Sequence, residues 1–239
     1  MPGSKLKADA RKLMFENMPR IFIISLIYVL AGTLLAWLIV RLPKSISINM
    51  QDINTRLASG EIPGFGIIYT GFRPAGDILA LLLFLLQPVI DIGFISYCLK
   101  TNRAQKTEFK DLLNGFLFIF KIISIFIITT ILVFLWSMLF IIPGIVASYR
   151  YRLAYYILLD DPQKSALTCI SESKRLMHGR KLDLLIIDFS FLGWYILDFI
   201  IAMLTPLPFA LPLVSVWLSP YVWLTRAAFY ENQITTAAV

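Results

Sequence analysis

Residues 21–40 read IFIISLIYVLAGTLLAWLIV, a run of twenty residues without a charged side chain. At 1.5 Å per residue, a helix of this length covers about 30 Å, the thickness of the hydrocarbon core of a bilayer. A cleaved signal peptide has a shorter apolar part and a small-residue cleavage site, whereas this run is full length and is followed by Arg41 and Lys44. We therefore predict a retained spanning helix at 21–40. The basic amphipathic segment before it, residues 1–20, is suited to the headgroup region.

The composition extends this interpretation to the whole chain. Hydrophobic residues make up 58% of the 239 and charged residues only 15%, and the mean hydropathy is +0.76, so one soluble core could not hide the apolar surface. The sequence predicts an all-α, polytopic transmembrane helical bundle that forms a single membrane domain over residues 21–239. Pro88 is expected to break the second span, and Pro143 with Gly144 to stop the third. Six spans are predicted, at 21–40, 78–99, 116–142, 145–159, 182–204 and 211–229.

The fourth of these runs leaves an alternative open. Its fifteen residues reach only about 23 Å as a helix, so residues 145–159 form either a short crossing helix or one that uses the Asp160-Asp161 turn to reach the surface.

The distribution of lysine and arginine predicts the orientation. Fourteen of these residues fall in the N-terminal segment and in the loops at 100–115 and 160–181, against four in the long loop at 41–77. By the positive-inside bias, both termini are cytoplasmic. The basic residues form short clusters beside apolar runs, as expected for contact with anionic lipids. They form no basic stripe interleaved with exposed aromatics, so we expect no nucleic-acid partner.

Two connections have features of their own. Asp161 can cap a helix that has Pro162 at its first position, and Gly179 can end it, so we predict a cytoplasmic surface helix over residues 163–178. That helix lies on the membrane or bundle, or docks a partner. The external loop at 41–77 is long enough to act as a lid or as an inert cap, and the sequence does not decide between them.

The chemistry available argues against an enzyme. His178 is the only histidine, in a basic helix end, where a solvated capping role explains it, and the sequence has no His/Cys/Asp cluster with metal-ligand spacing. The phosphate-binding glycine loop, the zinc-protease helix and the Gly-x-Ser-x-Gly elbow are all missing from the sequence. We expect no catalytic residues, no metal and no cofactor.

Charged residues inside the predicted spans are the informative feature. Each costs several kcal/mol in hydrocarbon unless it is paired, hydrated or able to reach the headgroups. Counted along the helices, most lie about 10 to 14 Å from the cytoplasmic surface, in one layer with two more bases than acids. Either these side chains pair and pin the helices together, or they line a hydrated pocket for an anionic group such as a lipid phosphate. The candidate ligand-binding residues are Asp91, Lys121, Arg150, Arg152, Asp188 and Arg226.

Several stretches together resemble a known bacterial family. They include FIIPGIV at 140–146, SYRY at 148–151, AYYIL at 154–158, DDP at 160–162 and SKRLM at 173–177. This pattern is similar to the integral membrane proteins catalogued as domain of unknown function 975, and more loosely to the membrane domain of some bacterial glycerophosphodiester phosphodiesterases. The resemblance implies a helical membrane architecture and supplies no catalytic residues. Asp91 and the long external loop depart from the family pattern.

These observations lead to two functional hypotheses. The first is a non-enzymatic protein of the bacterial cytoplasmic membrane that binds or passes an amphipathic, lipid-like anion through the inner-leaflet polar layer, with anionic membrane lipids as its partners. The second is a structural or accessory subunit that stabilises or regulates another membrane protein complex, with purely architectural charges.

Overall fold

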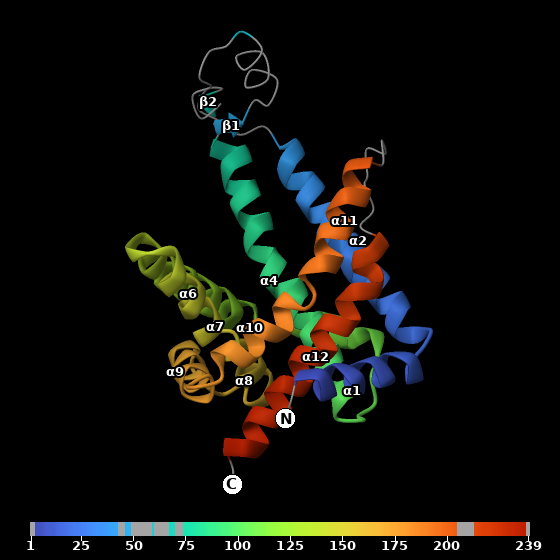
Figure 1. Cartoon of the computed structure of the whole chain (residues 1–239). Coiled ribbons are helices and arrows are strands. Elements are labelled where there is room, and N and C mark those ends of the chain that lie inside the picture. Colours follow the sequence, from blue (N-terminus) through green and yellow to red (C-terminus); the bar gives the residue numbers. More distant parts are fainter. Residues whose placement is uncertain are drawn as a thin grey trace. The chain divides into compact units, whose positions relative to one another are not determined.

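The structure is a computed structural model that describes residues 3–42, 46–48, 59, 67–69, 74–204 and 213–237 (Figure 1). Nearly all of these residues are helical, which confirms the all-α fold class. The elements are α1 Gly3–Glu16, α2 Arg20–Arg41, β1 Ile46–Ile48, β2 Ile67–Tyr69, α4 Pro74–Asn102, the 3₁₀ helix η1 Phe109–Leu113, α5 Asn114–Leu117, α6 Ile119–Leu139, α7 Ile141–Arg150, α8 Ala154–Asp160, α9 Ala166–Leu176, α10 Lys181–Phe189, α11 Leu192–Leu204 and α12 Leu213–Ala237.

The chain divides into two compact units by its contacts, and the single membrane domain expected over residues 21–239 stays a prediction. Residues 33–87 form one unit, and residues 1–32 with 88–239 form the other. The smaller unit contains the antiparallel pair β1–β2, in which Ile46 lies opposite Tyr69. Most of the loop at 41–77, whose role as a lid or cap the sequence left open, lies outside the described residues. The boundaries between the units fall within α2 and α4, and the larger unit contains the other helices and all the candidate site residues.

Within the described part of the chain, four helical stretches are long and apolar enough to cross a membrane. They match the predicted first, second, third and fifth spans, while the count of six spans and the side of each terminus stay predictions. The expected break in the second span is wrong, because α4 continues as a helix through Pro88. The four stretches are Arg20–Arg41, Pro74–Asn102, Ile119–Leu139 and Lys181–Ile201.

The predicted third span ends earlier than its proline suggested. Helix α6 stops at Leu139, Phe140 adopts an extended conformation, and α7 begins at Ile141. Pro143 therefore lies in the first turn of α7, where its missing N–H costs no intrahelical hydrogen bond. Helices α6 and α7 pack against each other as a hairpin (Figure 1).

The predicted fourth span, 145–159, is not one helix. It consists of α7 and α8, separated by residues 151–153. The buried Ser173 hydroxyl of α9 donates to the Arg150 carbonyl at 3.0 Å and accepts from the Leu153 N–H at 3.1 Å. One side chain from another helix thus bonds both backbone groups at the break, and so stabilises it.

The surface helix predicted at 163–178 is shorter than expected. Helix α9 begins at Ala166 and is capped by Ser165, whose Oγ accepts the Thr168 N–H at 3.2 Å. Asp161, the expected cap, instead accepts the Gln163 N–H at 3.1 Å in a local turn. Both residue types can fill the cap position, and the one closer to the apolar run takes it.

The N-terminal helix α1 buries its apolar face in the bundle, and its position in the headgroup region stays a prediction. Leu6, Ala10 and Met14, each four residues apart, are buried on one face, and α1 packs against α12 (Figure 1). Lys7 reaches the break between α10 and α11, where its Nζ donates to the Ser190 hydroxyl at 2.9 Å. The core cluster at this position comprises Ala10, Met14, Ile21, Ile24, Phe94, Tyr97, Cys98 and Leu224.

A close approach of two backbones fixes α4 against η1 and α5. A Cβ on Gly93 would lie 1.9 Å from the Leu112 carbonyl oxygen, and one on Gly115 would lie 2.1 Å from that of Val89. Glycine at both positions lets these segments touch through their main chains.

Candidate anion-binding site

Asp188 collects charged and polar partners from separate helices. It lies in α10, and its Oδ1 accepts a hydrogen bond from Nε of Arg226 in α12 at 3.0 Å. Nη2 of Arg152, in the turn after α7, lies 3.7 Å from Oδ2, and the Tyr149 hydroxyl donates to the same oxygen at 3.1 Å. The Asp188 and Arg226 side chains are only 11% and 12% exposed, whereas Arg152 is 39% exposed. We call these four residues the Asp188 cluster.

Aromatic rings add to the environment of both arginines. The Arg226 guanidinium lies over the Trp223 ring, 5.0 Å from its centroid, and Arg152 lies 5.9 Å from the centroid of Tyr149. Such contacts stabilise a cation without neutralising it. With two arginines on one carboxylate, the Asp188 cluster carries a formal charge of one positive unit.

Arg150 is a further cation, which lies in the sequence between Tyr149 and Arg152 of the Asp188 cluster. It is the last residue of α7, and its carbonyl is bonded by Ser173. Its Nε atom is buried and has no hydrogen-bond partner among the described residues. An unsatisfied buried donor on a charged group is costly, which makes Arg150 the natural contact for an additional acceptor.

The other two predicted site residues have contacts with other segments. Asp91 of α4 accepts a hydrogen bond from the Tyr28 hydroxyl of α2 at 2.9 Å, and the Tyr28 ring stacks on Phe94. Nζ of Lys121, near the start of α6, donates to the Pro162 carbonyl at 2.5 Å. The structure thus joins Arg152, Asp188 and Arg226 by direct contacts, and gives Asp91 and Lys121 neighbours that the sequence did not suggest.

A second network was missed by the sequence analysis. Arg103, just beyond α4, lies 2.7 Å from Asp160 and 2.7 Å from Glu231, and the Tyr230 hydroxyl donates to Asp160 at 2.6 Å. The hydrogen bond and charge of Asp160 raise the pKa of Arg103, while burial and then the same carboxylate raise the pKa of Tyr230. This network ties the ends of α4 and α8 to α12. The DDP stretch at 160–162 was the only signal in the sequence for this network. It did not indicate that Arg103 and Tyr230 are the partners of Asp160.

The fold and these buried charges define a helical membrane protein with several candidate spans. Residues 138–237, from the end of α6 to the end of α12, match the family described as "Protein of unknown function (DUF975)". The resemblance to domain of unknown function 975 is therefore confirmed over this part of the chain, which contains the Asp188 cluster. No curated protein and no solved structure matches the chain. The looser similarity to the membrane domain of phosphodiesterases stays a prediction.

Proposed function

We propose that this chain is a non-enzymatic protein of the bacterial cytoplasmic membrane that binds or passes an amphipathic, lipid-like anion beside the Asp188 cluster. Anionic membrane lipids are its partners, and both termini are cytoplasmic. The anionic group of the ligand contacts Arg150, with Arg152 and Arg226 providing the positive field around it.

The observation that carries this proposal is the excess of positive charge. Asp188 already has two arginines, and the Nε of Arg150 is buried without a hydrogen-bond partner in the described residues. Asp188 is seven residues beyond Lys181, where its candidate span begins, a distance of about 10 Å along a helix. A cation at this depth is costly unless an anion accompanies it, and a lipid phosphate supplies that anion without leaving the membrane.

The test uses Arg150→Gln in the full chain in phosphatidylcholine nanodiscs, with and without phosphatidic acid. Ligand binding to the folded state raises the unfolding temperature, so phosphatidic acid should stabilise the wild type. Arg150→Gln should unfold at the wild-type temperature or higher without phosphatidic acid, because it removes a cation that makes no ion pair with the described residues, and should lose most of the lipid-induced shift. Arg11→Gln, on the exposed face of α1, is the matched control and should keep the full shift.

An accessory role is the second candidate, and the pairing around Asp188 favours it. Arg226 and Arg152 both contact the same carboxylate, as charges that pin helices together would do. On this alternative, phosphatidic acid shifts the Arg150→Gln variant as much as the wild type. That result would contradict our proposal and leave a structural or regulatory subunit of another membrane complex.

A further inference from the structure

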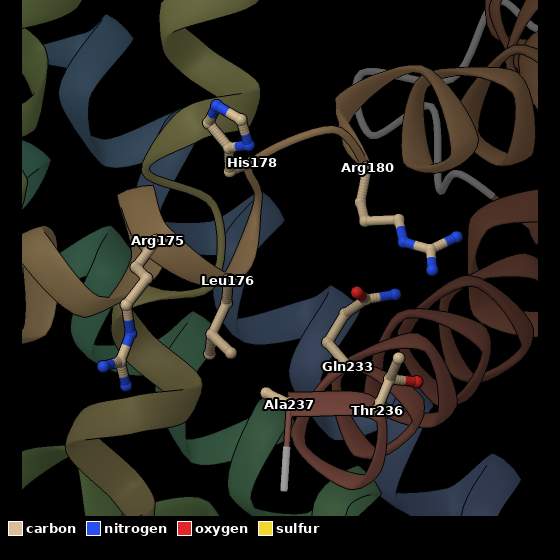
Figure 2. A pocket seen from close by; sticks show the side chains of 7 residues that line it. All are labelled: Arg175, Leu176, His178, Arg180, Gln233, Thr236 and Ala237. Carbon is tan, nitrogen blue, oxygen red and sulfur yellow. The ribbon is translucent and has the colours of Figure 1, made fainter. Parts of the chain in front are cut away.

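A basic pocket lies where α9 ends, α10 begins and α12 ends (Figure 2). Its volume is about 360 Å³, within the range of sites for small molecules. Figure 2 shows Arg180 extended toward Gln233, with His178 at the opposite rim and Arg175 beyond Leu176. The lining residues are Arg175, Leu176, His178, Arg180, Gln233, Thr236 and Ala237.

The lining contains basic residues and no carboxylate. Arg180 lies 3.5 Å from Asp183, outside the pocket lining, but both side chains are about half exposed and such a pair is weak in water. Arg175 makes no ion pair with any residue that the structure describes. The pocket therefore has a positive potential that Asp183 offsets only weakly among the residues that the structure describes.

Gln233 distinguishes this pocket from an ordinary basic helix end. The residue is only 6% exposed, its amide points into the pocket in Figure 2, and the amide makes no hydrogen bond within the described ranges. Arg175 in the last turn of α9 has a structural explanation, because a cation there complements the helix dipole. That explanation does not account for the Gln233 amide on α12, a further polar group with donor and acceptor atoms that the pocket presents to a ligand.

We propose that this pocket binds a phosphate group, which accepts hydrogen bonds from the Arg180 guanidinium and the Gln233 amide. Arg175 adds positive field at the rim, and an N–H of the His178 ring offers a further donor. The Thr236 hydroxyl already donates to the Asn232 carbonyl at 2.7 Å, so it is not one of the donors. A soluble phosphate compound and a phospholipid headgroup present the same chemistry. This site goes beyond the proposed function, because none of its lining residues belongs to the Asp188 cluster.

The experiment measures phosphate binding to the full-length protein in two settings. Inorganic phosphate is titrated into the detergent-solubilised protein by calorimetry, and phosphatidic acid is compared with phosphatidylcholine alone in nanodiscs by its effect on unfolding temperature. Arg180→Gln and Gln233→Leu should each weaken binding about tenfold, the loss of one charge-assisted or buried hydrogen bond. Gln233→Leu keeps the side-chain volume and should not reduce stability, which separates lost binding from lost folding.

Lys174→Gln is the matched control, because it removes one exposed positive charge from the same helix end without touching the pocket. Binding of inorganic phosphate supports a soluble ligand, and a response to phosphatidic acid that Arg180→Gln and Gln233→Leu reduce supports a lipid headgroup. No binding in either setting, or equal weakening by Lys174→Gln, overturns the proposal. Any phosphatidic acid response that remains in Arg150→Gln should still be reduced by Arg180→Gln and Gln233→Leu, so failure of this site and failure of the proposed function are distinguishable.

Discussion

At the residue scale, the Asp188 carboxylate is the charge on which the local packing depends. Its two arginines differ in quality: Arg226 makes a 3.0 Å hydrogen bond and is 12% exposed, whereas Arg152 stands 3.7 Å away and is 39% exposed. Breaking the short buried contact leaves an uncompensated charge, whereas loss of the 3.7 Å contact leaves the shorter Arg226 contact in place. The two arginines should therefore contribute unequally.

We predict that Arg226→Gln lowers the free energy of unfolding by about 3 kcal/mol, because it removes the buried partner of Asp188. Arg152→Gln, which leaves the shorter contact intact, should cost about 1 kcal/mol or less. Denaturant unfolding of both variants in the same detergent measures the difference. Equal losses of unfolding free energy in the two variants would contradict the prediction that the Arg226 contact contributes more to stability than the Arg152 contact.

The sequence could predict which charges need partners, but not which partners they find. It named Arg152, Asp188 and Arg226, because a charged residue inside an apolar run must be satisfied by something. It could not join Asp91 to Tyr28, 63 residues earlier, or Arg103 to Glu231, 128 residues later. Counting residues along a helix gives depth, whereas the rotation of each helix decides which side chains meet.

At the element scale, the glycine contact between α4 and the η1–α5 segment is the tightest constraint described. Gly115 lies against the main chain of Val89, which cannot move aside as a flexible side chain can. A methyl group at this position would force the two segments apart or bend α4.

We expect Gly115→Ala to lower the free energy of unfolding by about 3 kcal/mol, as overpacking against a backbone does. Gly193→Ala in α11 is the control, because a Cβ there would meet nothing within 4 Å and alanine favours a helix by about 1 kcal/mol over glycine. Thermal unfolding of the two variants gives the comparison. A Gly115→Ala protein as stable as the control would refute the close contact.

The helices themselves were easier to predict than their interruptions. Long apolar runs gave four of the spanning stretches, because length and hydrophobicity are local properties of the sequence. The break at 151–153 is stabilised by Ser173 from α9. It is therefore a tertiary feature, and the sequence of residues 145–159 alone does not predict it. Helix ends were misplaced for the related reason that Asp161 and Ser165 are both acceptable caps.

At the scale of the whole molecule, the packing of α1 on α12 places both ends of the larger unit together. Gly3 and Leu6 of α1 line a cavity with Phe229, Asn232 and Gln233 of α12. We therefore predict that the first and last described helices emerge on the same side of the membrane.

This arrangement predicts the labelling of single cysteines at Ser4 and Thr235, both at exposed positions. A membrane-impermeant maleimide should modify Ser4→Cys and Thr235→Cys from the same side, and our proposed orientation makes that side the cytoplasm. Cys98 and Cys169 are fully buried, so the wild-type protein provides a background of low reactivity. Modification of the two positions from opposite sides would contradict the packing.

The contact between Lys7 and Ser190 joins residues 183 positions apart in the chain. During biosynthesis, α1 therefore leaves the ribosome long before the helices that cover its apolar face exist. Leu6, Ala10 and Met14 stay exposed to chaperones or to lipid until α12 has been translated and inserted. The packing of α1 is therefore completed only after α12 has been synthesised. A protein truncated before α12 would keep the apolar face of α1 exposed, which makes it a substrate for membrane quality control.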